Sequence, residues 1–223
     1  VNVRGFSVGE LNDYGRELLL RDQIGIIYQF YNLIPNLTAK NNIELPMVIA
    51  KKKRNYIKNR VQKLLADVDM VDQAHQYPST LSGGEKQRIG IAMALANDPP
   101  ILLADEPTAN VDSISGEKIA QIFKKLIEDD PKKSILIVTH DNLMRKIADR
   151  TLVLRDGQII DEFIENKEES VLKEIDSFKS RDESVFRKDS HLIINQNHLP
   201  FYEELDKCRY CGSINILTSY DKE

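Results

Sequence analysis

The sequence has two cysteines, no tryptophan and no long apolar run. Its longest uninterrupted apolar stretch spans residues 91–96, far short of the roughly 20 residues that a membrane-spanning helix needs. Any membrane role is therefore expected to depend on a partner chain. Cys208 and Cys211 are too few for a disulfide framework, and no secretory signal is visible near Val1. These absences favour the cytosol as the compartment.

A second absence concerns glycine, because none of the ten glycines is followed by lysine. A phosphate-binding P-loop requires Gly-Lys-Ser/Thr after a glycine-rich turn, so these residues contain no such loop. The chain also lacks a basic excess. Its formal net charge is −4, which argues against non-specific nucleic-acid binding as its main activity. The length of 223 residues suits one ordinary domain with an appendage.

Residues 81–88, Leu-Ser-Gly-Gly-Glu-Lys-Gln-Arg, come directly before an amphipathic run. Ser82 is a good N-cap for a helix that begins here. Gly83 and Gly84 would leave the amides of the first turn free of bulky side chains, and such a helix N-terminus binds anions, most often phosphate. Ser-Gly-Gly alone is equally typical of a capped core helix.

Residues 101–106 form a short apolar run that ends in Asp105 and Glu106 and is followed by Pro107. The run is typical of a buried parallel strand, whose carboxyl end is where open α/β sheets bind ligands. One of these carboxylates can hold Mg²⁺ through water, and the next can accept a proton from an attacking water.

Segment 81–88 followed by 101–106 resembles the nucleotide-binding subunit of ATP-binding cassette (ABC) transporters. The resemblance covers about residues 1–160 and is specific, since several independent motifs occur in the family's order. It implies an α/β fold over residues 1–161, with a P-loop-NTPase-like (RecA-like) parallel sheet and an inserted helical subdomain at about 37–97. Residues 1–5 resemble the hairpin that follows the P-loop helix in the family. We therefore expect a sheet that is incomplete at the N-terminus, with the first third of the domain cut off.

The resemblance also assigns roles to the residues that match the family's motifs. It implies that Glu106 is the general base, that Asp105 holds Mg²⁺ through water, and that Gln29 contacts Mg²⁺ and the attacking water. His140, directly after the apolar run 134–139, matches the switch histidine that contacts the γ-phosphate. The implied nucleotide contacts are Ser82, Gly83, Gly84, Gln87 and Asp112. ATP and Mg²⁺ are thus the implied cofactors. Ala109 and Val111 depart mildly from the usual D-loop sequence.

The same resemblance implies two kinds of protein partner. Two copies would pair head to tail, with each ATP between Glu106 of one copy and residues 82–84 of the other. Closing on ATP and reopening after hydrolysis would drive a membrane-spanning permease, which places the chain peripherally at the cytoplasmic face of the cell membrane. Residues 29–46 and 81–88 look most like the lipoprotein-releasing and macrolide-exporting branch. No nucleic-acid partner is expected.

Two rival functions remain open. A DNA-repair or chromosome-associated ATPase shares the 81–85 motif, but such proteins place long coiled coils between the glutamine loop and that motif, and here only residues 30–80 intervene. An inactive regulatory relic is the alternative if Val1 is a true start. The basic run 51–54 is interpreted as a solvated helix start, with a phospholipid contact as the alternative.

Beyond the ATPase domain, residues 162–190 are charged and sparse in apolar side chains, which is typical of a linker. Residues 191–223 form a small appendage that contains Cys208-x-x-Cys211-Gly, which resembles half of a zinc ribbon. A structural Zn²⁺ needs four ligands, and His191 and His198 are doubtful additions to the two thiols. Unmetallated thiols and a redox pair are the alternatives.

Overall fold

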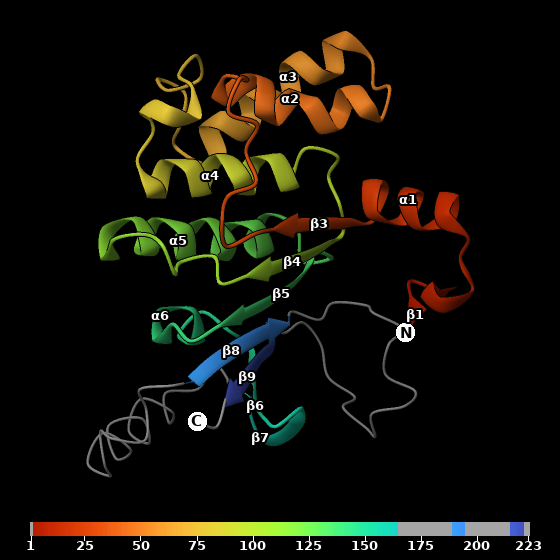
Figure 1. Ribbon diagram of the computed structural model, residues 1–223, viewed down its shortest axis with the longest axis vertical. Helices are drawn as coiled ribbons and strands as arrows, with labels where there is room; N and C mark the ends of the chain where they lie inside the picture. The colour runs from red at the N-terminus through yellow and green to blue at the C-terminus, as the bar shows by residue number, and fades with distance from the viewer. Residues whose placement is uncertain (1, 165–188, 195–214, 221–223) are drawn as a thin grey trace.

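The structure is a computed structural model that describes residues 2–164, 189–194 and 215–220 (Figure 1). Its centre is a seven-stranded sheet in the order β3-β4-β5-β8-β9-β6-β7. The strands of this sheet are β3 (Ile24–Ile27), β4 (Ile101–Asp105), β5 (Ser134–Thr139), β6 (Arg150–Arg155), β7 (Gln158–Ile164), β8 (Asp189–Ile194) and β9 (Asn215–Tyr220). The parallel sheet expected from the sequence is thus present.

Strands β3, β4 and β5 run parallel, and their register places polar residues at one edge. Ile27 pairs with Ala104, and Asp105 pairs with Val138. The strand residues are mostly Ile, Leu and Val, whose side chains suit a pleated surface that is buried. Because the three strands end at a common edge, the residues that follow them meet there.

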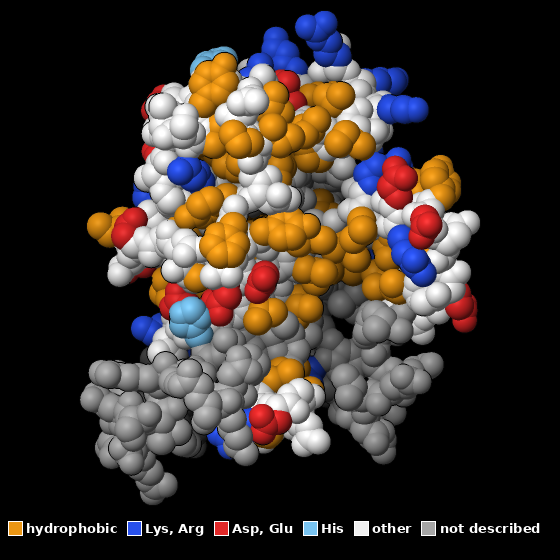
Figure 2. All heavy atoms as spheres, in the orientation of Figure 1, with side chains coloured by type: hydrophobic (Ala, Val, Ile, Leu, Met, Phe, Trp, Pro, Cys, Tyr) orange, Lys and Arg blue, Asp and Glu red, His pale blue; other side chains and the backbone are white. Residues whose placement is uncertain are grey.

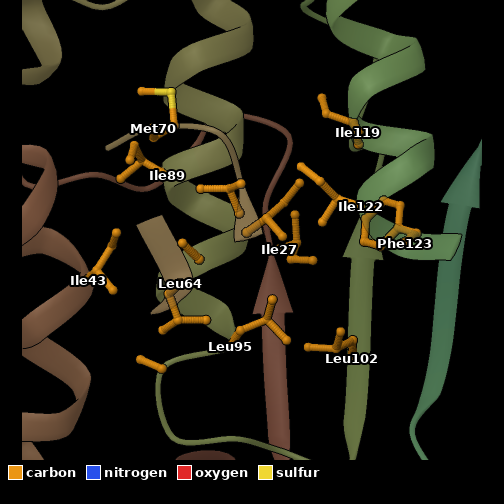
Figure 3. Close-up of a cluster of buried hydrophobic side chains, with 14 of the residues drawn as sticks. Ile27, Ile43, Leu64, Met70, Ile89, Leu95, Leu102, Ile119, Ile122 and Phe123 are labelled. Carbon is orange, nitrogen blue, oxygen red and sulfur yellow. The ribbon is translucent and has the colours of Figure 1, made fainter. Parts of the chain in front are cut away.

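Two long helices cover one face of this parallel unit, namely α4 (Gly83–Ala94) and α5 (Ser113–Asp129). Their buried side chains join those of the strands in the main core (Figure 3). A smaller cluster of Val3, Leu19 and Ile101 lies where α1 (Asp13–Asp22) and the hairpin of β1 (Asn2–Val3) and β2 (Phe6–Ser7) meet β4. The core therefore extends from the sheet into the helical layer above it.

The segment from residue 37 onward is helical, as the sequence predicts. It contains α2 (Ala39–Ile49), α3 (Arg54–Asp67), a 3-10 turn (Pro78–Thr80) and α4, which lie together above the sheet in Figure 1. Buried Asn42 fixes the entry to this layer, because its side chain accepts from the amide of Ile34 and donates to the carbonyl oxygens of Ile34, Leu37 and Thr38. Such a fully paired buried amide is stable and holds the loop after β3 in one position.

After β5 the chain forms the short helix α6 (Asn142–Arg145) and the antiparallel hairpin β6–β7. The hairpin turns at Asp156 and Gly157, both with positive φ (53° and 74°), as a type I′ Asp-Gly turn requires. Strands β8 and β9 come from the predicted appendage and pair with β5 and β6. Among the described residues, no helix has both the length and the apolar character that a bilayer crossing needs.

Candidate nucleotide site

Ser82 begins α4 with a full capping box. Its hydroxyl accepts a hydrogen bond from the Glu85 amide (3.3 Å), and the Glu85 carboxylate accepts one from the Ser82 amide (2.8 Å). The hydrogen bond from the Ser82 backbone lowers the pKa of Glu85 below its ordinary value, so the box is strongest when Glu85 is ionised. The cap expected at Ser82 is therefore present, together with a partner that the sequence interpretation did not use.

Gly83 and Gly84 lie against other loops of the site, which is a packing role that sequence reasoning missed. A Cβ at Gly84 would lie 2.2 Å from Oγ of Ser115 at the start of α5. A Cβ at Gly83 would lie 2.8 Å from the carbonyl oxygen of Asn110. Only glycine allows the first turn of α4 to approach α5 and the D-loop this closely.

The carboxylates predicted at 105 and 106 lie at the end of β4. Asp105 is exposed, whereas the side chain of Glu106 is only 13% exposed. Glu106 has a φ of 43°, and its amide donates to the carbonyl oxygen of Val138 (2.8 Å). A left-handed backbone is uncommon for glutamate, and such conformations concentrate at functional sites. The turn directs the two neighbouring acids into different environments.

Both carboxylate oxygens of Glu106 are held by residues that follow β5. Oε2 accepts from the hydroxyl of Thr139 (3.1 Å), and Oε1 lies 2.8 Å from Nδ1 of His140. An N–H at Nδ1 donates to the carboxylate, which leaves Nε2 of the 57% exposed imidazole directed to its other side. The structure thus brings Glu106 and His140 together, as the motif order implied.

A second layer of hydrogen bonds supports this pair and was not identified from the sequence. Thr139 Oγ1 also accepts from the Asp141 amide (3.0 Å), and Asp141 Oδ2 accepts from the hydroxyl of Thr108 (2.7 Å). Asp141 Oδ1 in turn caps the amide of Leu143 at the start of α6. The only sequence signal was the position of threonine and aspartate on either side of His140.

Gln29 leaves β3 at the same edge as Glu106, since Ile27 pairs with Ala104 in the neighbouring strand. The loop that contains Gln29 is tied to the D-loop by Asn110, whose side-chain amide donates to the Gln29 carbonyl oxygen (3.2 Å). The hydroxyl of Tyr31 donates back to the Asn110 carbonyl oxygen (3.3 Å). Tyr31 has a φ of 62°, so this loop is held in a left-handed turn.

Two other predicted nucleotide contacts have structural partners within the chain. Gln87 is 1% exposed and donates to the carbonyl oxygen of Tyr28, so in this structure it supports the loop after β3. Asp112 caps α5, where Ser115 donates to it from both the amide (3.0 Å) and the hydroxyl (2.9 Å). These bonds lower the pKa of Asp112. Neither arrangement tests whether the residue also contacts a nucleotide.

The donor set at this edge fits Mg²⁺ bound mainly through water and phosphate. Asp105 and Gln29 offer hard oxygen ligands, which magnesium prefers, and Asp105 is exposed to solvent. No group of three or more His, Cys, Asp or Glu side chains within the described ranges is arranged to enclose a metal ion. Figure 2 shows acidic side chains and a histidine gathered at mid-height of the visible face. The zinc prediction at Cys208 and Cys211 falls outside the described residues.

Comparisons with known proteins agree with these motifs. Residues 7–109 match the family model described as ABC transporter. The chain is 39% identical over 163 residues to the lipoprotein-releasing system ATP-binding protein of Zymomonas mobilis, covering 73% of this chain and 70% of that protein. It is 40% identical to an uncharacterised ABC transporter ATP-binding protein of Methanocaldococcus jannaschii, with 71% and 69% covered.

Solved structures give the same relationship. A dimeric ATP-binding cassette in a post-hydrolysis state, bound to ADP and phosphate, is 40% identical and superposes with a TM-score of 0.65 over 72% of this chain and 70% of that chain. A second dimeric cassette structure has the same score over 70% of this chain and 69% of its own.

Proposed function

Because this chain belongs to the ABC transporter family as an ATP-binding subunit, we propose that Glu106 is the general base of its ATP hydrolysis. The observation that supports this role is the grip on both Glu106 oxygens by Thr139 and His140 at the carboxyl end of β4. A carboxylate fixed in this way needs little reorganisation when it accepts a proton from the attacking water. In the complete protein the chain is an ATP hydrolase that energises a separate membrane-spanning partner.

The other residues of the edge divide the remaining work. Asp105 holds Mg²⁺ through water, and Gln29 contacts the same ion and orients the attacking water. Bound Mg²⁺ neutralises charge on the phosphate oxygens. His140 holds Glu106 through Nδ1 and directs Nε2 toward the γ-phosphate. The exposure of Asp105 and the position of Gln29 at the same edge support this division.

The first turn of α4 acts across a dimer. Ser82, Gly83 and Gly84 of one copy contact the ATP held by Glu106 and His140 of the other copy, and Gln87 and Asp112 support that contact. Glycines at 83 and 84 keep this surface free of side chains, as a close approach to phosphate requires. ATP binding then closes the dimer and hydrolysis reopens it.

The partner is a membrane permease at the cytoplasmic face of the cell membrane, and the transported class is a lipoprotein released from that membrane. This assignment derives from the similarity to the lipoprotein-releasing protein of Zymomonas mobilis. It would be tested by copurification of the complete protein with a permease encoded beside it, followed by lipoprotein-stimulated ATPase assays in vesicles. ATPase activity that does not respond to any lipoprotein would contradict the lipoprotein assignment while leaving the ATPase assignment intact.

The general-base role is tested by Glu106→Gln in the complete protein. The amide keeps the size and one acceptor but cannot take a proton, so turnover should fall by at least about 100-fold while ATP still binds. The unreacted nucleotide should then trap the closed dimer, which size-exclusion chromatography with and without ATP measures. A variant that hydrolyses ATP at the normal rate would exclude Glu106 as the base.

A further inference from the structure

The turn between α2 and α3 presents cations and aliphatic side chains on one surface. We define the α2–α3 patch as Val48, Ile49, Lys51, Lys52, Lys53 and Arg54. Val48 and Ile49 are 55% and 58% exposed, and all four cations are exposed. Figure 2 shows Lys and Arg side chains along the upper edge of the molecule, next to hydrophobic side chains, where α2 and α3 lie in Figure 1.

This surface is strongly positive although the chain as a whole is acidic. Residues 45–66 contain seven Lys and Arg residues and no Asp or Glu, whereas the whole chain has a net charge of −4. The acid that Lys52 influences, Asp22, is already paired with Arg21 (2.7 Å), and Arg21 is the main cause of its lowered pKa. Most of the positive charge of the patch is therefore left for an external anion.

The backbone holds the patch in a fixed shape. Lys51 has a φ of 53°, and the amides of Lys51 and Lys52 donate to the carbonyl oxygens of Val48 and Met47, closing the end of α2. Met47 is fully buried, so the turn is anchored to the core while its neighbours Val48 and Ile49 project outward. The cations are thus presented by an ordered turn.

We propose that the α2–α3 patch binds the headgroup region of an anionic phospholipid membrane. Lysines attract anionic headgroups, while exposed valine and isoleucine gain from entering the boundary of the acyl chains. Tyr56, 43% exposed on the next turn, is a residue type that favours the membrane interface. The mixture of lysine and aliphatic side chains fits a lipid surface better than a nucleic acid.

Cosedimentation of the complete described chain with vesicles tests the proposal. The protein should bind vesicles that contain 30% phosphatidylglycerol and should not bind pure phosphatidylcholine vesicles, and 0.5 M salt should release it. Each lysine near an anionic surface strengthens binding about fivefold. The triple variant Lys51→Gln, Lys52→Gln, Lys53→Gln should therefore lower the partition coefficient on the order of 100-fold.

Two further variants make the result specific. Lys124→Gln, Lys132→Gln, Lys146→Gln removes the same charge from exposed sites elsewhere and should change binding less than about threefold. Val48→Ser with Ile49→Ser keeps every cation and should weaken binding severalfold. Circular dichroism would verify that all variants keep their helices. Since no nucleotide or permease is present, these results do not depend on the ATPase assignment.

Three outcomes would overturn the proposal. The first is equal loss of vesicle binding in the patch variant and the matched control, which would indicate a general charge effect. The second is equal binding to phosphatidylcholine vesicles. The third is binding to duplex DNA, at physiological salt, that the patch variant loses while its vesicle binding is unchanged.

Discussion

The hydroxyl of Thr139 makes two hydrogen bonds at once, donating to Glu106 and accepting from the amide of Asp141. Thr139 is fully buried, so water cannot replace these bonds. Thr139→Val keeps the shape but loses both bonds, which would loosen the carboxylate that we assign as the base. We expect kcat of the complete protein to fall on the order of tenfold, with KM for ATP little changed.

Thr139→Ser is the matched variant, because it keeps the hydroxyl and removes one methyl group. Steady-state phosphate release should show a kcat close to that of the unaltered protein, even where the small cavity lowers the melting temperature. If valine and serine lowered kcat equally, the hydroxyl would have no positioning role.

Gly84 offers a test of packing between the two helix starts. An added methyl group would meet Oγ and Cβ of Ser115 at 2.2 and 2.5 Å, so Gly84→Ala should lower the free energy of unfolding by about 2 kcal/mol. Gly9→Ala is the control, since nothing lies within 4 Å of its Cβ position. Urea unfolding would measure both changes.

A double variant separates the clash from other effects of alanine. Ser115→Gly removes both atoms that the new methyl group would meet, so the combination with Gly84→Ala should cost less than the sum of the two single changes. Strict additivity would show that the glycine requirement has another cause.

At the scale of the helix, the capping box of α4 predicts a pH dependence. The pKa of Glu85 is lowered in the folded protein, so its contribution to stability is fully present above the ordinary glutamate pKa of about 4.3. That contribution is lost as the pH falls through the lowered folded-state value. Glu85→Gln should therefore unfold more easily than the unaltered protein at pH 7, and the difference should shrink toward pH 3.

Urea midpoints measured from pH 7 to pH 3 check this prediction. The two proteins share every other titrating group, so only the difference between them reports on Glu85. A difference that stayed constant with pH would mean that the carboxylate charge has no part in the cap.

Asp98 connects three elements through one carboxylate. Its Oδ1 accepts from Lys133 (2.8 Å), just before β5, and from Arg60 of α3 (3.0 Å). Burial acts to raise the pKa of Asp98, but the bonds and charges of these two cations outweigh burial and lower it. Asp98→Ala would leave the buried ammonium of Lys133 without its shortest bond, at a cost of about 2 kcal/mol in unfolding free energy.

Asp98→Asn is the informative control, because asparagine tolerates the φ of 56° at this position and keeps an oxygen acceptor. It should recover part of the loss in a thermal unfolding experiment. Equal destabilisation by Ala and Asn would indicate that the negative charge, and not the acceptor, supports the two cations.

Most elements could be predicted from periodicity and capping, because these signals are local. The apolar run 101–106 predicted β4, and Ser82 predicted the start of α4. The contacts between loops could not be predicted in this way. The bond from Asn110 to the Gln29 carbonyl oxygen joins residues 81 positions apart, and no local pattern specifies it. Sequence order located the site, and long-range packing determined which atoms meet within it.

For the whole molecule, the head-to-tail dimer makes a prediction that a monomeric site would not. In the Glu106→Gln background, Ser82→Arg should abolish the ATP-dependent dimer, because a bulky side chain would stand where the first turn of α4 approaches the nucleotide of the other copy. Binding of ATP to the separated copies should be unchanged, since each copy's own nucleotide contacts lie elsewhere. Light scattering and nucleotide titration of the complete protein would measure the two properties independently.

Ser82→Ala controls for the lost cap, which alone costs about 1 kcal/mol of helix stability. Alanine adds no bulk at the surface, so the Glu106→Gln, Ser82→Ala protein should still dimerise with ATP. If arginine instead weakened ATP binding to isolated copies and left assembly intact, Ser82 would belong to the nucleotide site of its own chain. The two readouts therefore distinguish a shared site from a private one, because only a shared site links loss of assembly to a surface that its own nucleotide never touches.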